Sequence, residues 1–388
     1  MHMSAFVIIL IVTSLMLANF YVGLNYNKLI KEENSKLLII VFWVFQCFFT
    51  FVLILNFLLF FTGRHNGRAS IIIEYIAGFT ASFSLYSIIM FIIRDIFRQL
   101  AKVIPFHNAS RLIGNFVYRC GMIAVITASI ITVYGFVNAK NYKVIDYNVT
   151  LDKKESTIDG LNAVFVSDAH MGCAVGAAEL QIIVDKINAV NPDVVFLGGD
   201  FFDDGTTEQL KEQASEILKG LTAKYGVYFV LGNHECYLDD DAKQESYFAN
   251  AGIQVIDDKV VMIDNKFILV GRKDRTNGRV DITKLMQGVE TETLPVILLD
   301  HEPIYKDMKR VAAEGADLQL SGHTHAGQIF PMYLFDFFET VPWYGKYKTG
   351  DLQTLVSSGV GAWAVPIRIG SPSEIMYVHI SFEGKNKY

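Results

Sequence analysis

Five short segments of the chain carry side chains that could hold metal ions, and each follows a strand-like apolar run. In the last of them, His323 and His325 lie two residues apart, directly after the run Ala316 to Leu320. Side chains at i and i+2 of an extended segment point to the same side, so both imidazoles are expected to face one point in space. An H-x-H pair on its own is more often two ordinary surface or core histidines, so the other four segments decide its meaning.

The other four segments have the same form, an apolar run followed by Asp, Asn or His, often beside glycine. In chain order they supply Asp168 and His170, then Asp200, then Asn233 and His234, then His301. Carboxylate, imidazole and amide oxygen are ligands that suit Mn, Fe and Zn. Together with the H-x-H pair, these groups are too many for one ion and about right for two.

Such a pair of ions would perform a particular chemistry. Two ions about 3.5–4 Å apart need a shared ligand, which a carboxylate provides well, and together they lower the pKa of a bridging water so that hydroxide exists at neutral pH. They also neutralise the oxygens of a phosphate ester as in-line attack builds up charge. The residues therefore predict hydrolysis of a phosphoester by metal-bound hydroxide.

The elements expected to position these groups alternate between strands and helices. Strands are predicted over Tyr142–Leu151, Ala163–Ser167, Asp193–Leu197, Val227–Leu231, Val260–Ile263, Phe267–Val270 and Pro295–Leu299, and helices over about Glu179–Val190, Thr207–Leu221 and Asp240–Asn250. This alternation favours an α/β domain with a buried sheet. Ligands in such folds gather at the C-terminal ends of the strands. The aspartates Asp203 and Asp204, which follow Asp200, are expected to belong to a solvated loop, and a role as metal ligands is the alternative.

The N-terminal part of the chain has a different composition. The whole chain of 388 residues is 52% hydrophobic and 19% charged, with a mean hydropathy of +0.31. Four apolar stretches, Ala5–Leu24, Leu37–Phe61, Ile71–Ile93 and Phe116–Val137, each meet the roughly 20 residues needed to cross a bilayer. The first lacks the basic start and cleavage site of a signal peptide. We predict an all-α bundle of four transmembrane helices in residues 1–141 and a globular domain in residues 142–388.

The orientation of this bundle is predicted from its basic residues. The loops after the first and third spans hold Lys28, Lys31, Lys36, Arg94, Arg98, Lys102, Arg111 and Arg119, whereas the opposite side holds Arg64, Arg68, Lys140 and Lys143. The positive-inside rule then places both termini and the globular domain outside the cytoplasm of a multi-pass cell-membrane protein. The segment Asp95–Ile104 is either an amphipathic surface helix or an extension of the third span.

Charge and cysteine content exclude other classes of function. The net charge is −6 and the pI is about 5.9, so no nucleic-acid partner is expected. Cys47 and Cys120 fall in predicted spans, where they serve as small apolar residues. Cys173 and Cys236 each follow a candidate metal-binding segment and could meet near the site, but no spacing typical of zinc or of a disulfide framework is present.

Taken in order, the blocks D-x-H, G-D, G-N-H-E, a single H and G-H-x-H resemble the signature of the calcineurin-like metallophosphoesterases, over about Leu161 to Ile380. The resemblance implies a four-layer α/β/β/α sandwich and a hydrolase with two divalent ions, Mn, Fe or Zn. It implies that one metal is held by Asp168, His170 and His325, the other by Asn233, His301 and His323, and that Asp200 bridges them. His234 would stabilise phosphoryl oxygens or protonate the leaving alkoxide, with Glu235 or a backbone group orienting its ring.

The later sequence is similar to the membrane-associated subgroup of this family. The segments G-H-T-H-A-G-Q-I, S-S-G-V-G-A-W-A-V-P-I-R and P-S-E-I carry this likeness. The subgroup includes exported bacterial phosphodiesterases and is similar to a UDP-diacylglucosamine pyrophosphatase. Ala326 stands where the subgroup often has Gly, and a four-span anchor differs from its usual single span or export signal.

Two further features bear on the substrate. Aromatic residues crowd the segment Phe330 to Tyr347; half of them are expected in the core, and the others in an exposed apolar lip that suits a lipid substrate or contact with the bilayer. Arg368 is a candidate for binding a phosphate bidentately, and a structural ion pair is the alternative.

The most direct hypothesis is a membrane-anchored enzyme that hydrolyses a phosphodiester or pyrophosphate bond, with lipid-linked substrates among the candidates. The alternative is a membrane receptor or scaffold with an inactive phosphoesterase-fold domain, against which the intact ligand set argues. A transporter is a third hypothesis. It has little support, because Glu74 is the only acidic residue within the predicted spans.

Overall fold

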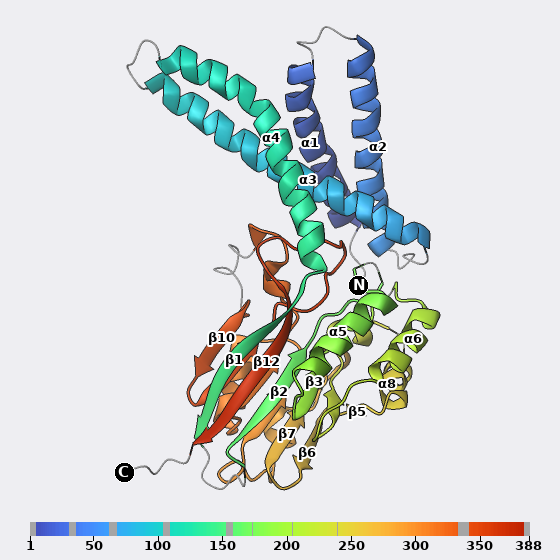
Figure 1. The fold of residues 1–388 in the computed structure, drawn as a ribbon, viewed down its shortest axis with the longest axis vertical. Helices are drawn as coiled ribbons and strands as arrows, with labels where there is room; N and C mark the ends of the chain where they lie inside the picture. The colour runs from blue at the N-terminus through green and yellow to red at the C-terminus, as the bar shows by residue number, and fades with distance from the viewer. Residues whose placement is uncertain are drawn as a thin grey trace. The chain divides into compact units, whose positions relative to one another are not determined.

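The computed structural model describes residues 5–30, 36–61, 68–103, 109–152, 158–172, 174–203, 205–238, 240–332 and 341–383. The chain divides into two compact units, residues 1–137 with 364–366, and residues 138–363 with 367–388. Residues 138–141, which the sequence assigned to the membrane domain, belong here to the second unit. Figure 1 shows helices in the first unit and mixed strands and helices in the second.

The first unit contains four long helices, α1 (Ala5–Ile30), α2 (Lys36–Phe61), α3 (Arg68–Val103) and α4 (Ala109–Ala139). Three of them contain segments long and apolar enough to cross a membrane, namely Phe6–Lys28, Lys36–Leu59 and Ser70–Phe97. In α4 the apolar portion with described side chains is Ile123–Ala139, which is shorter. The described residues therefore contain three candidate membrane-crossing segments, and the fourth predicted span stays a prediction.

Polar side chains join α1 to α3 inside this unit. The hydroxyls of Tyr26 and Ser87 lie 2.7 Å apart, and the Ser84 hydroxyl donates to Asn19 Oδ1 at 2.8 Å. Such hydrogen bonds between membrane helices stabilise their association by about 0.6 kcal/mol each. The helix α3 runs unbroken to Val103, so the segment after Asp95 extends the third helix and does not form a separate surface helix.

The second unit is built on two six-stranded sheets, with the strand orders β1-β12-β2-β3-β4-β5 and β10-β11-β9-β8-β7-β6. Its strands are β1 (Tyr142–Asp152), β2 (Gly160–Val166), β3 (Val194–Leu197), β4 (Val227–Phe229), β5 (Gln254–Val255), β6 (Lys259–Ile263), β7 (Phe267–Gly271), β8 (Val296–Leu299), β9 (Leu318–Ser321), β10 (Gly345–Thr349), β11 (Leu352–Val356) and β12 (Ser373–Glu383). Its helices are α5 (Ala177–Ala189), α6 (Glu208–Leu218), α7 (Asn233–Cys236), α8 (Asp241–Asn250), α9 (Ile282–Leu285) and α10 (Tyr305–Ala313).

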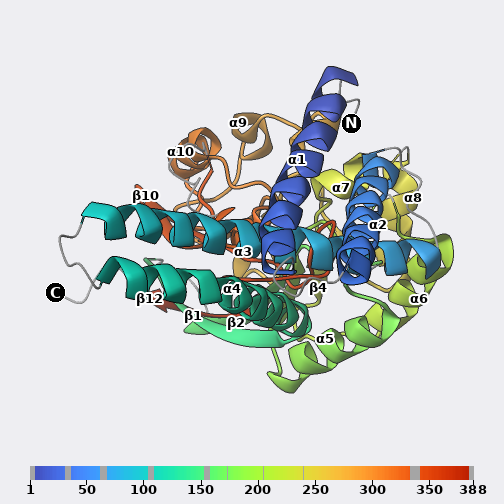
Figure 2. The ribbon, with the colours of Figure 1, turned by 90° about the horizontal axis from the view of Figure 1, so that it is seen from above.

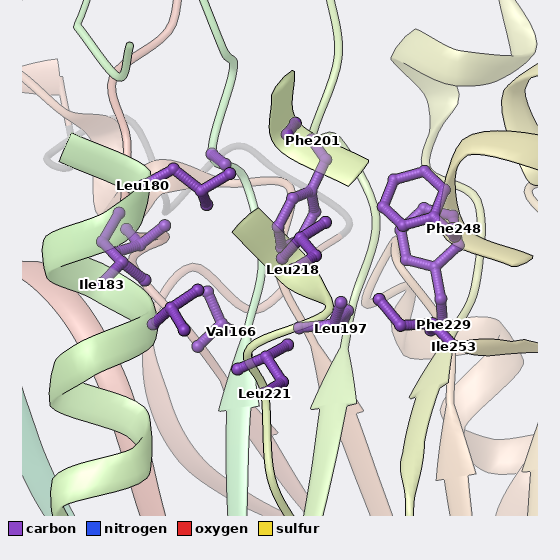
Figure 3. Close-up of a cluster of buried hydrophobic side chains, with 14 of the residues drawn as sticks. Val166, Leu180, Ile183, Leu197, Phe201, Leu218, Leu221, Phe229, Phe248 and Ile253 are labelled. Atoms are coloured by element: carbon purple, nitrogen blue, oxygen red, sulfur yellow. The ribbon is translucent and has the colours of Figure 1, made fainter. Parts of the chain in front are cut away.

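Alternation along the strands gives this unit four layers. Strand β3 sends Val195 and Leu197 into a cluster with residues of α5 and α6, and it sends Val194 and Phe196 into a second cluster between the two sheets, because successive side chains point to opposite faces. Figure 3 shows Leu197 among Leu180, Leu218 and Phe229 in the first cluster. A third cluster joins the other sheet to α9 and α10, which lie on the side opposite α5 (Figure 2).

The unit is thus a mixed α/β domain with two sheets, and its layers agree with the four-layer α/β/β/α sandwich that the resemblance implied. The sequence did not predict β5, β10, β11 and β12. Strand β12 comes from the C-terminal end of the chain and lies between β1 and β2, parallel to β1 and antiparallel to β2. It therefore joins the first strand of this unit to the strand that precedes Asp168. Its 11-residue pairing with β1 could not be read from the local sequence, because no alternation rule specifies a partner so far along the chain.

Candidate metal centre

The predicted metal-binding side chains follow strands β2, β3, β4, β8 and β9, and the structure brings them together. Asp168, His170 and His325 form one group of facing ligand atoms, and Asp200, His301 and His323 form another. In the first group, His170 Nε2 lies 2.9 Å from His325 Nε2. In the second, His301 Nε2 lies 3.0 Å from Asp200 Oδ2. The convergence follows from the sheets, whose parallel strands end at one edge.

Asp200 lies between the two groups. Its Oδ2 atom is 3.0 Å from His301 Nε2 and 3.8 Å from His170 Nε2. Asn233 joins the second group, because its Oδ1 lies 2.8 Å from His323 Nδ1. One carboxylate therefore faces ligand atoms of both groups.

The two histidines of the H-x-H pair do not face one point, contrary to the first expectation. His323 belongs with Asp200 and His301, and His325 with Asp168 and His170. The reason is the backbone, which is not extended here, since φ is +73° at His323 and +51° at His325. Left-handed backbone is uncommon for residues other than glycine and often marks functional sites. Asp168, His170 and Asp200 share this conformation.

Glycines beside the ligands are required by close packing. A Cβ at Gly232 would overlap Asp200 Oδ1, and a Cβ at Gly322 would overlap Asp168 Oδ2. The backbone of one ligand segment therefore touches the carboxylate of another. This explains why G-D, G-N-H and G-H-x-H each carry a glycine immediately before the polar residue.

The donor set fits divalent cations. Asp168 Oδ2 is buried without a hydrogen-bond partner, and His170 Nε2 and His325 Nε2 face each other at 2.9 Å. Burial and the neighbouring His170 and Arg368 hold the pKa of His325 well below its usual value. Burial and His301 lower the pKa of His323 to about 4. Both rings are therefore neutral at physiological pH, as a histidine must be to bind a metal.

Asp203 is the residue of this site that the sequence prediction missed. One oxygen, Oδ1, lies 2.6 Å from His170 Nδ1 and 2.9 Å from His234 Nδ1. It is not a member of a solvated loop, since its side chain is only 21% exposed. Histidines that bind metals usually donate their second N–H to a carboxylate, which fixes the ring. Asp203 fills that position for His170 and orients His234 with the same oxygen.

His234 lies at the edge of the first group. Burial acts to lower its pKa, but the negative charges of Asp200 and Asp203 outweigh burial and raise the pKa to about 10. Because Asp203 accepts at Nδ1, the Nε2 atom is left for another partner. A protonated imidazole beside a cluster of oxygen and nitrogen ligands can supply a proton or stabilise an anion.

This arrangement of residues agrees with comparisons with known proteins. Residues 161–327 match the family of calcineurin-like phosphoesterases. This matched segment is similar to a calcineurin-like phosphoesterase domain and includes all of the predicted metal ligands. A transmembrane protein with metallophosphoesterase domain of Danio rerio is 32% identical over 283 residues, which are 69% of this chain and 64% of the relative.

Two bacterial relatives are similarly close. An uncharacterized metallophosphoesterase of Helicobacter pylori is 31% identical over 247 residues, covering 61% of this chain and 64% of the relative. One of Aquifex aeolicus is 29% identical over 268 residues, covering 66% of this chain and 98% of the relative. The chain thus spans less than two thirds of the length of the Danio rerio and Helicobacter pylori relatives.

Glu235 has a different task in the phosphoesterase domain from the one expected. Its carboxylate does not contact the His234 ring in any hydrogen bond that the structure records, and instead accepts four backbone N–H groups. These belong to Asp200, Phe201, Phe202 and Gly232, at distances of 2.6–2.9 Å. Glu235 is fully buried. It therefore holds the loop of Asp200 against the loop of Asn233, while Asp203 orients His234.

Glu235→Gln is expected to destabilise this loop pair. An amide offers one acceptor oxygen instead of two. The two buried N–H groups that face the replaced oxygen therefore lose their acceptor, at a cost of about 3 kcal/mol. The melting temperature should fall by roughly 6–12 °C. Thermal unfolding in detergent measures this, with exposed Glu216→Gln on α6 as the control. Equal melting temperatures for the two variants would contradict the role given to Glu235.

Asp257 is hydrogen-bonded to the segment that leads from β4 to Asn233. Its Oδ1 accepts the N–H of Leu231 at 3.0 Å, whereas its Oδ2 is shielded from solvent and has no hydrogen-bond partner. Burial raises the pKa of Asp257 to about 7. The folded domain therefore binds this proton more tightly than the unfolded chain does. The resulting stabilisation is complete below the unfolded pKa and is lost as the pH rises towards about 7.

Asp257→Asn is expected to remove this pH dependence. The wild-type domain should lose on the order of 2 kcal/mol between pH 5 and pH 8 because of this group, allowing for its partial exposure. The variant should therefore melt a few degrees above the wild type at pH 8 and close to it, or below it, at pH 5. The measurement is the difference in melting temperature at the two pH values, with Asp185→Asn on the surface of α5 as the control. A difference that does not change with pH would refute the assignment.

Arg368 does not occupy the place predicted for a phosphate-binding residue. It is fully buried, and its donors reach protein acceptors, among them Gly361 O at 2.6 Å, Pro372 O at 2.8 Å and His325 Nδ1 at 3.1 Å. Among the residues that the structure describes, no carboxylate forms an ion pair with this guanidinium, and its acceptors are main-chain oxygens, Ser371 Oγ and His325 Nδ1. Arg368 therefore packs the loop after β11 against His325.

The end of helix α4 is tied to the same loop. Asn138 Nδ2 donates to Ser371 O at 2.9 Å and to Arg368 O at 3.2 Å, and the Ser373 hydroxyl donates to Ala139 O at 2.9 Å. The last turn of a predicted membrane helix is thus hydrogen-bonded within the phosphoesterase unit.

The remaining predictions concern aromatic and cysteine residues. Of the crowded segment, Phe330 and Tyr344 are about one third exposed, whereas Tyr333, Phe335, Phe337 and Phe338 lie outside the described residues. Cys236 is a buried free thiol. Cys173 lies outside the described residues, so its position stays open.

Proposed function

We propose that this protein is a membrane-anchored phosphoesterase that hydrolyses a phosphodiester or pyrophosphate bond with two divalent cations. The observation that carries the proposal is the place of Asp200, whose Oδ2 faces His301 Nε2 and His170 Nε2 from two adjoining ligand groups. A single carboxylate shared by two sets of histidines suits a pair of cations. The relative named as a transmembrane protein with metallophosphoesterase domain supports the combination of membrane and hydrolase parts.

The residues are proposed to divide the work as follows. One cation is held by Asp168, His170 and His325, the other by Asn233, His301 and His323, and both by Asp200. When bound, Mn, Fe or Zn supplies positive charge for the phosphoryl oxygens and lowers the pKa of a water. Glu235 keeps the loop of Asp200 in place, and Asp203 fixes the rings of His170 and His234.

His234 is proposed to deliver the proton that the leaving oxygen needs. Its Nδ1 is occupied by Asp203, and the carboxylates around it favour the charged ring. Its Nε2 is then the acidic atom that faces the substrate, and the proton passes from it to the departing alkoxide as the ester bond breaks. Bound cations would lower the pKa of His234 from its metal-free value towards the range in which a general acid is effective.

The membrane anchor favours a substrate at the bilayer. Strand β1 begins at Tyr142, directly after the end of α4 at Ala139, so no long linker separates the helix from the catalytic part. We propose a lipid-linked phosphoester as the first substrate class to test. From the distribution of basic loop residues we also propose that the catalytic part lies outside the cytoplasm. Protease digestion of the catalytic part in intact cells tests this, and full protection would argue for the opposite orientation.

The test uses the purified full chain in detergent. Metal content per chain is measured first, and hydrolysis of an aryl phosphodiester and of a nucleotide-linked lipid pyrophosphate is then followed with Mn²⁺, with Asp200→Asn as the blank. About two metals and turnover above the blank are expected. Two metals without turnover would limit the proposal to other phosphoesters. Absence of metal would favour the alternative, a membrane receptor or scaffold with an inactive domain.

A further inference from the structure

Two large aromatic side chains flank the proposed proton donor. The ring of Tyr237 lies 5.5 Å from that of His234, and the ring of Trp363 lies 6.0 Å from it, both at steep interplanar angles. Tyr237 is 43% exposed and Trp363 is 40% exposed. Exposed aromatic rings beside a reactive side chain are characteristic of a surface that receives a ligand.

Both rings are carried by fixed backbone. The Gln328 side chain holds Trp363 from both directions, because its Oε1 accepts the Trp363 N–H at 2.8 Å and its Nε2 donates to Trp363 O at 3.0 Å. Tyr237 closes the short helix α7, where its N–H donates to Asn233 O at 3.0 Å. The two rings are therefore placed as rigidly as the metal-binding segments from which they extend, and are not side chains of a loose surface loop.

The free nitrogen of His234 determines which part of a substrate meets these rings. Asp203 accepts at Nδ1, so only Nε2 can protonate a leaving oxygen. The group attached to that oxygen must lie next to His234, and hence next to Tyr237 and Trp363. In the proposed reaction the phosphoryl group would lie on the other side, towards Asp200 and the two ligand groups.

From this geometry we propose that Tyr237 and Trp363 are the two walls of a leaving-group subsite that takes a flat ring, such as an aryl or nucleobase-bearing alcohol. This inference rests on the proposed hydrolase function and specifies its substrate class. Three aromatic side chains, His170, Tyr237 and Trp363, contact the ring of His234. Aromatic walls favour a flat π-system, which stacks or packs edge to face, over a flexible chain that needs a long aliphatic groove.

The experiment compares two methyl phosphodiesters with the full chain in detergent and Mn²⁺. One releases a phenol and the other a fluorinated alkanol of matched pKa, so that chemical reactivity is equal and only the shape of the leaving group differs. In Trp363→Leu and in Tyr237→Leu, kcat/KM for the aryl ester should fall about tenfold, and that for the alkyl ester should change less than about twofold. Trp363→Phe should restore most of the aryl preference.

Tyr305→Leu is the matched control, because Tyr305 is similarly exposed (39%) on α10, and it should leave both rates unchanged. Equal losses on both esters would overturn the subsite, because the rings would then only support His234. An octyl ester that depends on Trp363 as strongly as the aryl ester would also overturn it, since the walls would then receive an alkyl chain.

A binding measurement separates this inference from the proposed function. Calorimetry with phenylphosphonate and methylphosphonate needs no turnover and uses the Mn²⁺-loaded chain. Wild type should bind the phenyl compound about tenfold more tightly, and Trp363→Leu should bind the two equally. Equal binding by wild type would refute the subsite even in an active enzyme. Turnover no greater than that of Asp200→Asn, together with a phenyl preference, would refute the hydrolase function and leave the subsite standing.

Discussion

Asp200→Asn is expected to lower phosphodiester hydrolysis by about a thousandfold or more. The amide has nearly the shape of the carboxylate but lacks its negative charge, so the histidines on both sides lose the one anion that they share. Although burial acts to raise the pKa of Asp200, His301 and His234 hold it well below its usual value. The native side chain is therefore fully ionised at any pH at which the enzyme would work.

The same substitution should reduce the metal content from about two ions per chain. Metal analysis and initial rates on an aryl phosphodiester are the measurements, and Asp185→Asn on the outer face of α5 is the control for removing one carboxylate. Near-normal turnover in Asp200→Asn would refute the shared-carboxylate site. A variant that keeps both metals and loses only activity would show that Asp200 acts on the reaction and is not needed to retain the ions.

His234→Ala is expected to lower the rate by about a hundredfold to ten-thousandfold while keeping the metals. His234 lies outside the two ligand groups described above. Its Nδ1 lies 2.9 Å from Asp203 Oδ1, its ring contacts the edge of the His170 ring, and its backbone N–H donates to Asp200 Oδ1 at 2.9 Å. That backbone contact survives the substitution. Loss of metal would instead identify His234 as a ligand.

Asp203→Asn tests in a second way whether the charged form of His234 contributes to the rate. The amide still contacts both rings but no longer stabilises the charged form of His234, so a smaller loss of rate is expected. The double variant should lose much less than the product of the two single losses, because Asp203 acts largely through His234. If the rate losses of the two single variants multiply fully in the double variant, Asp203 acts mainly through His170. Asp203→Asn should also weaken metal retention slightly, which His234→Ala should not.

The sequence was sufficient where local chemistry carries the information. The polar residues after β2, β3, β4, β8 and β9 could be predicted to meet, because parallel strands deliver their ends to one edge. The α/β class also follows from the alternation of strands and helices, whereas the four layers were implied by the family resemblance. Asp203 could not be separated from Asp204 in the same way, since only the tertiary structure decides which carboxylate turns towards His170. A signal was present in its spacing three residues after Asp200, but an aspartate-rich loop is usually solvated.

Two other predictions failed because they assumed regular backbone or an available side chain. The pairing of His323 with His325 at one point assumed an extended segment, whereas both residues are left-handed. Arg368 was a candidate for binding a phosphate, with a structural ion pair as the alternative, yet its buried donors reach Gly361, Pro372 and His325. Neither property is encoded by residues adjacent in the chain. The place of β12 between β1 and β2 is likewise a long-range property.

The hydrogen bonds of Asn138 and Ala139 determine where the catalytic part could be separated from its anchor. A soluble fragment that begins at Tyr142, the first residue of β1, would lose the amide that donates to Arg368 O and Ser371 O and the carbonyl that accepts from Ser373. Arg368 holds the ring of His325, so a cut at the helix–strand junction would loosen a proposed metal ligand. A cut before Asn138 would preserve those contacts. The last turn of α4 is therefore part of the folded second unit, although it also ends the predicted membrane helix.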